Sequence, residues 1–322
     1  MRNLILSLAL LVFILSCSKK KTEVDATEIT TPSHDRFNKI KFIDTKVGFI
    51  VGGEQFLRPT MLKTNDGGDS WYEVSLPTNN ERKEIYGFDL FSNGQMITVG
   101  YGGTIFFSHD TGKTFQYLQH GSWKELKDIA FVNKDTAIIA GGTGFNQGHL
   151  SLFKTDGSGP NQITENIGFE LTDIDAVDTS TFYYAGYGAI LKSVDRGKTH
   201  DFTKAKNDFF TAMCWNNKEE GIAVGYEGSI LRTTDGGNAW KVIRNGNDFT
   251  KKKIHFLDVE RNAAERLVAV GEHGAVFISE DNGSSWKEAN KFTSNDLRGV
   301  FFRDNQTCFV VGENGTLFRL TF

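Results

Sequence analysis

Short apolar runs that end in Val-Gly or Ala-Gly recur along the whole chain. The glycines that end these runs are Gly52, Gly100, Gly141, Gly186, Gly225, Gly271 and Gly312. A spacing of roughly 40 to 50 residues, filled with short strands and turn residues, is typical of a β-propeller with four strands per blade. Seven recurrences therefore predict seven blades.

The sixth unit shows the expected plan of one blade. Its innermost strand is predicted over Lys252–Phe256, its second over Leu267–Gly271, its third over Ala275–Ile278 and its outermost over Trp286–Glu288. No window of the chain keeps a 3.6-residue apolar period, so helices should be nearly absent. The sequence thus predicts an all-β, seven-bladed propeller of four-stranded antiparallel blades.

The seventh unit is one strand short, because the chain ends at Phe322 directly after the third strand, Gly315–Leu320. An open sheet edge invites aggregation, and propellers normally hide it. The stretch Val24–Thr30 has enough β-branched residues to pair, and it precedes the first inner strand, Asn38–Phe42. We expect this N-terminal stretch to close the ring beside the third strand of the last blade.

A second repeat, Ser/Thr-x-Asp-x-Gly-x-x-aromatic, falls between the third and fourth strands. In such a turn the Asp carboxylate can accept backbone N–H groups, the Gly adopts a positive φ, and the aromatic side chain fills the gap between sheets. A truncated copy stands at Lys154–Gly157. Four full copies pair an aspartate with Trp or Phe: Asp66 with Trp71, Asp110 with Phe115, Asp235 with Trp240, and Asp281 with Trp286. The fifth copy has Asp195 but neither Phe, Tyr nor Trp at the last position.

This repeat resembles the Asp-box, or bacterial neuraminidase repeat, and the whole unit, as in Gly221–Gly237, is similar to the propellers of photosystem II assembly and stability factors. The resemblance implies a noncatalytic docking surface, often with Arg at the head of the inner strands. Arg298 matches that feature. The residues taken as its counterparts in other blades are Lys39, Tyr86, Lys127 and Thr172.

Sialidases share the repeat, and that resemblance implies an Arg triad with a Tyr nucleophile helped by a Glu. Here Phe302-Arg303 is followed by Asp304-Asn305, which departs from the sialidase motif, and no inner-strand set of three Arg emerges. A glycoside hydrolase of sialidase-like or related type, acting on envelope or environmental glycans, stays open as the alternative to a binding scaffold. No catalytic residue is assigned.

The N-terminus is a separate object. A positive start at Arg2, an apolar run over Leu4–Leu15 and the pair Ser16-Cys17 resemble the lipobox of bacterial lipoproteins. We interpret residues 1–16 as a lipoprotein signal peptide, 17–23 as a lipidated tether that starts at Cys17, and 24–322 as the propeller. An ordinary secretory signal is the alternative. Because Ser18 rather than Asp follows Cys17, the resemblance indicates a cell-envelope protein anchored in the outer membrane.

Charge and composition narrow the partners and cofactors. The chain has 36 basic and 40 acidic residues, and this balance argues against nucleic acid as a partner. Its seven His residues follow no metal-ligand spacing, and the second acid of Asp66-Gly67-Gly68-Asp69 is replaced by Lys113 and Lys198 in other copies, so neither a metal nor a cofactor is expected. Cys214 and Cys308 are predicted to be buried free thiols in a monomer.

One face of the propeller should carry the function. It is formed by the loops between the second and third strands and by the loops that lead into the inner strands. Its candidate residues are Phe56, Arg58, Tyr101, Trp123, Phe145, Tyr187, Tyr226, Glu227, Glu272, His273 and Glu313.

Aromatic residues beside carboxylates suit either a sugar ring or an anchor-and-rim protein interface. Tyr101, Tyr187 and Tyr226 recur at one repeat position, which also fits a packing role, whereas Phe56 and Trp123 stand outside the repeat and are the favoured anchors. The recurring Glu227, Glu272 and Glu313 predict a solvated acidic rim or, alternatively, a general acid. The function predicted is an envelope lipoprotein that acts as a noncatalytic scaffold for an envelope protein complex or a glycan.

Overall fold

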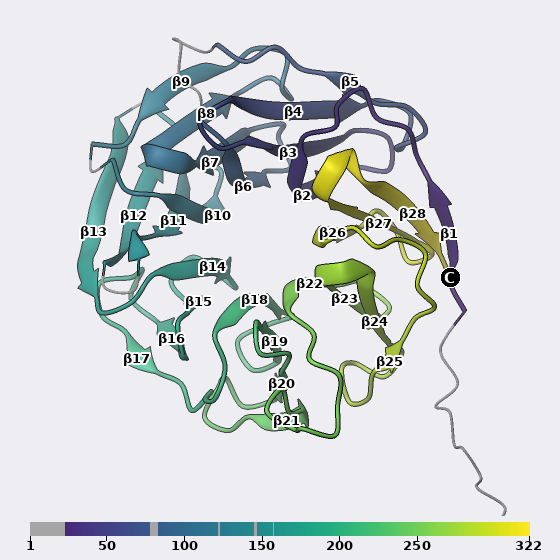
Figure 1. The fold of residues 1–322 in the computed structure, drawn as a ribbon. Helices are drawn as coiled ribbons and strands as arrows, with labels where there is room; N and C mark the ends of the chain where they lie inside the picture. Colours follow the sequence, from purple (N-terminus) through teal and green to yellow (C-terminus); the bar gives the residue numbers. More distant parts are fainter. Residues whose placement is uncertain (1–22, 78–82, 122, 145–146, 157) are drawn as a thin grey trace, which may run out of the picture.

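Seven four-stranded antiparallel sheets stand around a central axis and form a closed ring (Figure 1). This is a computed structural model, and it describes residues 23–77, 83–121, 123–144, 147–156 and 158–322. These ranges contain no α-helix and no helical segment able to cross a membrane. The predicted fold class is confirmed. The signal peptide predicted over 1–16 and the lipidation site Cys17 lie outside the described residues.

Every blade uses the same four positions, counted outward from the axis. The inner strands are β2 (Arg36–Phe42), β6 (Ile85–Leu90), β10 (Leu126–Asn133), β14 (Leu171–Ala176), β18 (Phe210–Trp215), β22 (Phe256–Arg261) and β26 (Leu297–Phe302). The second strands are β3 (Gly48–Glu54), β7 (Met96–Gly100), β11 (Thr136–Gly141), β15 (Phe182–Gly186), β19 (Gly221–Gly225), β23 (Leu267–Gly271) and β27 (Thr307–Gly312).

The third and outermost strands complete each blade, and most of the outermost strands are short and exposed. The third strands are β4 (Arg58–Thr64), β8 (Thr104–Ser108), β12 (Gly148–Lys154), β16 (Ala189–Ser193), β20 (Ile230–Thr233), β24 (Ala275–Ser279) and β28 (Leu317–Thr321). The outermost strands are β5 (Tyr72–Glu73), β9 (Gln116–Gln119), β13 (Gly159–Ile167), β17 (Asp201–Phe202), β21 (Lys241–Arg244), β25 (Lys287–Glu288) and β1 (Asp25–Glu28).

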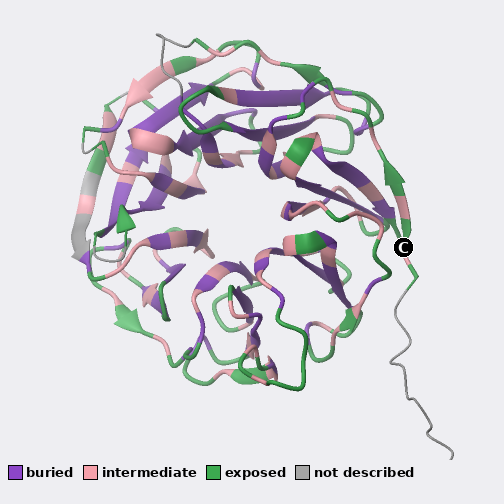
Figure 2. Ribbon diagram, viewed as in Figure 1, coloured by how far each residue is buried: buried purple, intermediate pink, exposed green. Residues whose placement is uncertain are grey.

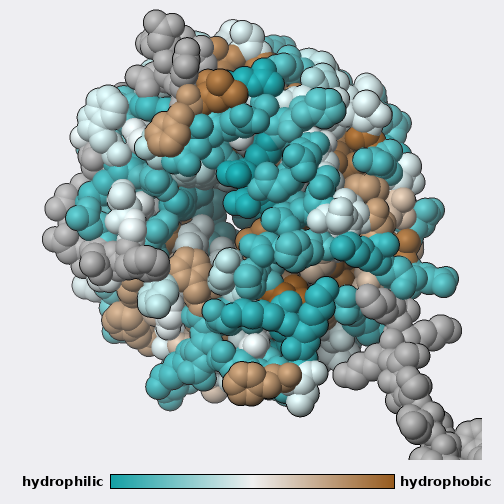
Figure 3. All heavy atoms as spheres, in the orientation of Figure 1, coloured by the Kyte–Doolittle hydropathy of each residue, from teal (hydrophilic) through white to brown (hydrophobic). Residues whose placement is uncertain are grey.

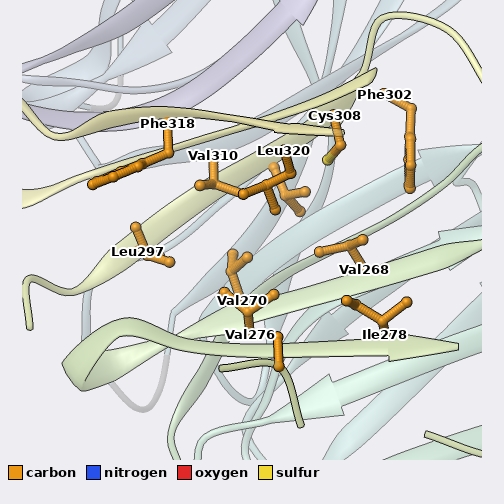
Figure 4. Packing of buried hydrophobic residues seen from close by; sticks show 12 residues of the cluster. Val268, Val270, Val276, Ile278, Leu297, Phe302, Cys308, Val310, Phe318 and Leu320 are labelled. Atoms are coloured by element: carbon orange, nitrogen blue, oxygen red, sulfur yellow. The ribbon is translucent and has the colours of Figure 1, made fainter. Parts of the chain in front are cut away.

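The apolar core lies between neighbouring blades. The second strands are buried along nearly their whole length, and Figure 2 shows burial concentrated inside the ring and exposure on its outer strands. Between the last two blades, Val268 and Val270 of β23 pack with Val310 of β27 and Leu320 of β28 (Figure 4). Cys308 is fully buried in the same cluster, and both Cys308 and Cys214 are free thiols. Both faces of the second strands pack against a neighbouring blade, so these strands are continuous buried runs rather than alternating ones.

The ring is closed by the N-terminal strand, as predicted. Strand β1 pairs antiparallel with β28, so that Asp25 faces Thr321 and Glu28 faces Phe318. The ladder continues with a hydrogen bond of 2.9 Å from the amide of Ile29 to the carbonyl of Leu317. The first and last segments of the described chain therefore share one sheet.

The repeated aspartates act inside their own turns, between the third and fourth strands. Asp66 accepts hydrogen bonds from the amides of Asp69 and Ser70, each at 3.0 Å, and the Thr64 hydroxyl accepts from the amide of Gly68 at 2.9 Å. The hydrogen bonds from Ser70 and Thr64 lower the pKa of Asp66 far below its ordinary value. These turns all lie at the end of the ring opposite to the candidate face.

One predicted strand is misplaced. The inner strand of the sixth blade was expected over Lys252–Phe256, but β22 begins at Phe256 and runs to Arg261. Residues 252–255 form a loop instead, because three consecutive lysines favour solvent over a place beside the axis, and the Arg244 guanidinium donates to the carbonyl of Lys252. The short apolar run Ile254–Phe256 was mistaken for the strand centre.

Candidate functional site

The candidate residues that the structure describes do gather on one face, which we call the upper face: the turns between second and third strands and the loops that enter the inner strands. Three of these turns are short 3-10 segments, η1 (Tyr101–Gly103), η3 (Glu272–Gly274) and η4 (Glu313–Gly315). Their first amides donate to the loop before the inner strand, as from Glu272 to the carbonyl of His255 at 2.9 Å. Figure 3 shows hydrophilic side chains around the central opening with separate hydrophobic patches among them. Phe145 lies outside the described residues.

Phe56 and Trp123 are the most prominent aromatic side chains that sequence reasoning placed on this face. Each is 64% exposed. Phe56 sits at the tip of the β3–β4 hairpin with a positive φ of 65°, and its ring meets that of Tyr101 edge-on, with centroids 5.0 Å apart. The ammonium of Lys83 lies 4.8 Å from the ring of Trp123. Both aromatic residues are therefore held by a neighbour while most of their surface faces solvent.

The other two recurring tyrosines have both a packing contact and an open side. Tyr187 meets Phe209 edge-on at 5.5 Å, and Tyr226 stacks on His255 at 3.9 Å. Their exposures are 54% and 40%. Recurrence at this position thus reflects local packing, and the exposed half of each ring still adds apolar surface to the upper face.

Each of the three glutamates of the acidic rim has a basic side chain as partner. Glu227 binds Lys253 at 2.5 Å, Glu313 binds Arg36 at 2.8 Å, and Glu272 lies 2.7 Å from Nδ1 of His255. The lysine and the arginine relieve mutual repulsion at Glu227 and Glu313, and the imidazole hydrogen-bonds Glu272.

Arg58 and His273 are the two remaining candidate residues of the upper face. Arg58 is paired with Asp35 at 2.8 Å. His273 leaves its side chain largely exposed, while its amide donates to Asp296 at 2.7 Å.

One sector of the upper face brings together Arg298, which the sequence singled out, and Arg36, which it missed. Arg36 and Arg298 share the single carboxylate oxygen Oε1 of Glu313, at 2.8 and 3.4 Å, and Arg298 also donates to Asn38 at 3.0 Å. Buried Glu84 completes the group by accepting from Asn38 at 2.7 Å. Burial, and then the neighbouring Arg36, lower the pKa of Arg298. Two guanidinium groups thus share half-buried Glu313, and Arg36 is also 3.4 Å from Glu84.

The register of the first blade corrects one assigned counterpart of Arg298. Each inner strand has a bulge after its first paired residues, and Arg298 occupies that bulge between Leu297 and Gly299. In the first blade the bulge lies between Phe37 and Lys39, so the counterpart is Asn38 rather than Lys39. A one-residue shift moves a side chain to the other face of the strand, which explains why Lys39 points to a different place.

Lys39 instead belongs to an ionic group along the axis of the ring, which we call the axial cluster. The cluster consists of Lys39, Lys41, Asp89, Asp128, Asp173, Asp175, Asp258 and Glu260, all from inner strands. Lys39 of the first blade binds Asp258 of the sixth at 3.0 Å and lies 3.9 Å from Asp173 of the fourth. Lys41 binds Asp89 at 2.8 Å.

The axial acids also join successive blades through the backbone. Asp173 accepts from the amide of Met213 at 2.7 Å, and Asp258 accepts from the amide of Val300 at 2.9 Å. Asp89 does the same for Phe131 at 2.7 Å. Each of these aspartates therefore hydrogen-bonds the inner strand of the following blade. In the sequence, an aspartate stands at the third position of β10, β14 and β22, but a search for apolar positions does not register this regularity.

Acids outnumber lysines in the axial cluster, and this excess of negative charge contributes to raised pKa values of its acids. Burial and then Asp128 raise the pKa of Asp175 to about 7, and burial and then Asp258 raise the pKa of Glu260 to about 8. Burial lowers the pKa of Lys39, but Asp258, Asp128 and Asp173 outweigh it and the net direction is upward. No group of three or more potential metal-ligating side chains occurs among the described residues.

A second buried polar group lies between the second and third blades. The ring centroids of His120 and His149 are 5.6 Å apart, and Nε2 of His120 contacts the Ser151 hydroxyl at 3.0 Å. Burial, and then His120 and Lys124, lower the pKa of His149 to about 4. This histidine is consequently neutral at neutral pH, and its role is packing beneath the upper face.

The comparisons with known proteins agree with this geometry. The family model described as photosynthesis system II assembly factor YCF48 matches residues 19–119 and 245–321. No curated protein sequence matches the chain.

Solved structures give the fold. A structure of YCF48 bound to a D1 peptide is 17% identical, with a TM-score of 0.73 over 94% of this chain and 96% of that one. YCF48 from Cyanidioschyzon merolae is also 17% identical, with a TM-score of 0.73 over 92% and 98%. The WD40 β-propeller domain of Doa1 is 11% identical, with a TM-score of 0.71 over 94% and 97%. At these identities the likeness concerns the propeller and not its ligands.

Proposed function

Because the matched segments make up more than half of it, the chain belongs to the family of the photosynthesis system II assembly factor YCF48, and we propose that it is a noncatalytic scaffold that binds a protein partner. The partner would lie across the upper face. A segment of extended polypeptide is the form of partner that best fits this face, since a structure of YCF48 holds a D1 peptide.

The observation that carries the proposal is the pair of exposed, locally supported aromatic residues Phe56 and Trp123. Large aromatic side chains are enriched among the residues that dominate binding energy, and pre-positioned ones lose little entropy when a partner arrives. Charged side chains lie on the same face. Lys83 contacts the ring of Trp123, and Arg36 and Arg298 share Glu313. Apolar anchors within a polar rim are the usual composition of a protein interface.

The carboxylates of the upper face support binding over hydrolysis. A glycoside hydrolase uses two carboxyl groups that flank the scissile bond, one of them protonated. Glu227 and Glu313 are instead paired with Lys253 and Arg36, and Glu272 contacts the imidazole of His255. Three acids whose pKa is raised, Asp173, Asp175 and Glu260, belong to the axial cluster. A fourth, Asp208, is buried, and its carboxylate already accepts hydrogen bonds from the amides of Glu227 and Ser229.

We test the proposal by affinity purification of the full chain from detergent-solubilised envelopes of its own cell, with Phe56→Ala and Trp123→Ala variants. Each substitution is expected to reduce capture of a defined protein set by about tenfold or more, because the loss of an aromatic anchor costs on the order of 2 kcal/mol. The matched control is Phe202→Ala, since Phe202 is 66% exposed but lies on the outer strand β17. Equal capture by the wild type and by the double variant at 56 and 123 would refute the proposal.

We also propose that the propeller is tethered to the cell envelope through lipid on Cys17, which rests on the lipobox-like sequence Leu15-Ser16-Cys17. The Cys17→Ser substitution is expected to abolish incorporation of labelled fatty acid and to move the chain from the detergent phase to the aqueous phase in a phase-partition assay. Lys19→Gln is the control, because it leaves the lipobox intact. Fatty-acid labelling that persists in Cys17→Ser would rule this tether out.

A further inference from the structure

A pocket of about 440 Å³ opens between the fifth and sixth blades, away from the central axis. One wall is apolar and includes Ile243, Ile254, Phe277 and Trp286. The rest of the lining is basic and includes Arg244, Lys252 and Lys287.

The pocket exists because the loop before β22 is long. Since β22 begins only at Phe256, residues 245–255 swing across the gap between the two blades. Arg244 secures this loop: its Nη1 group donates to the carbonyl of Gly228 and its Nη2 group donates to the carbonyl of Lys252. Phe249, at the tip of the same loop, is fully exposed. The wall formed by Lys252 and Ile254 is therefore built into the fold.

Basic side chains outnumber acids in the pocket. The guanidinium of Arg244 is 5.8 Å from the ring centroids of both Phe256 and Phe277, and the residue is 8% exposed. The lining also holds Lys251, Lys252 and Lys287, whereas Glu288 is its single acid. Glu288, Asp208 and Asp248 partly offset the charge of Arg244, and Lys251 is paired with Asp248 at 3.5 Å. A lining with a net positive charge favours the arrival of an anion.

The form of the pocket restricts which anion fits. Pockets for small molecules begin at about 300 Å³, so this one suits a single ring rather than a long chain. An inorganic anion would leave the wall of Phe277 and Trp286 unused, and a fatty acid, with one carboxylate and no hydroxyl groups, could not engage Lys252, Lys287 and the hydroxyl of Thr250 together. A sugar ring offers an apolar face to aromatic side chains and hydroxyl groups to polar ones.

We infer that the pocket between the fifth and sixth blades is a binding site for an acidic sugar residue of the uronic acid class. Its carboxylate would lie against Arg244 and the two lysines, and its ring would lie against the wall of Phe277 and Trp286. The site is separate from Phe56 and Trp123, so it would act beside protein binding rather than in place of it.

The test is calorimetric titration of the full chain with methyl β-glucuronide and with methyl β-glucoside, which has the same ring without the carboxylate. We expect the glucuronide to bind with a Kd on the order of 1 mM and the glucoside to bind at least tenfold more weakly. The double variant Lys252→Gln, Lys287→Gln is expected to weaken glucuronide binding by tenfold or more. Lys198→Gln is the control, because Lys198 is exposed in the turn between β16 and β17 of the fourth blade and does not line the pocket.

Three results would overturn the inference. The first is no heat of binding for the glucuronide up to 10-fold above the expected Kd, that is about 10 mM. The second is equal affinity for glucoside and glucuronide. The third is equal affinity for acetate or inorganic phosphate, which would mean a simple anion site. The two lysine substitutions lie on solvent-exposed positions, so a melting curve that matches the wild type separates lost binding from lost folding.

Discussion

The Thr27→Pro substitution is expected to open the ring and to lower the free energy of unfolding by about 2–3 kcal/mol. Thr27 faces Arg319 in the ladder between β1 and β28, two residues before the bonded pair formed by Ile29 and Leu317. Hydrogen-bonded positions alternate in an antiparallel pair, so the amide of Thr27 also points at β28. Proline removes that donor in the one sheet that joins the two ends of the propeller, and the freed edge of β28 would promote association.

Chemical denaturation and light scattering check this result. Glu28→Pro is the matched control, because Glu28 is exposed and its amide points away from β28. If both proline variants unfold at the same denaturant concentration as the wild type, then β1 contributes little and the ring is held by its other sheets.

Ring closure by the N-terminal strand could be predicted from the sequence, because it follows from counting the repeated strands. Seven strand-ending glycines require seven blades, the last unit stops one strand short, and Val24–Thr30 is the nearest segment able to pair. The Asp-containing turns were predictable for a related reason: their residues interact within a few positions of one another, as Asp66 does with Ser70.

The axial cluster could not be predicted in the same way. Lys39 contacts Asp173 and Asp258, which come from two other blades and are distant in sequence. Their proximity is created by ring closure and by the bulge that sets the register of each inner strand. An apolar pattern fixes which residues pack between sheets, but it does not reveal which polar side chains meet across an axis.

The upper face lies between these two cases. The sequence placed Phe56 and Trp123 on it because turn positions follow from the repeat. It predicted a solvated acidic rim but not the basic partners of these acids, since Lys253, His255 and Arg36 lie in loops or strand starts outside the repeat pattern. The pocket was missed because residues 252–255, two of which, Lys252 and Ile254, line it, were read as a strand.

Lys39→Met is expected to have the largest effect of any single substitution along the axis, a loss of about 3–5 kcal/mol in the free energy of unfolding at pH 8. The ammonium of Lys39 is the cation shared by Asp258 at 3.0 Å and Asp173 at 3.9 Å. Burial, and then Asp128, already raise the pKa of Asp173 well above its ordinary value. Without the lysine, two buried carboxylates would face each other's charge with only backbone donors to offset it.

The loss should shrink as the pH falls, and this dependence separates charge from packing. An acid whose pKa is raised by folding binds its proton in the folded state first, so its penalty is absent below about pH 4 and grows as the pH rises to its folded value. Because the pKa of Asp175 is about 7 and the pKa of Glu260 is about 8, the wild type itself should lose stability from pH 5 to pH 8. Lys39→Met should lose more over the same range. Urea unfolding at pH 5 and pH 8 measures how the stability of both proteins changes with pH.

Two further variants serve as controls. Lys46→Met, at an exposed position of the same blade, should match the wild type, and adding Asp258→Asn should restore much of the stability lost in Lys39→Met. An equal loss at both pH values would mean that Lys39 acts through packing of its alkyl chain and not through its charge.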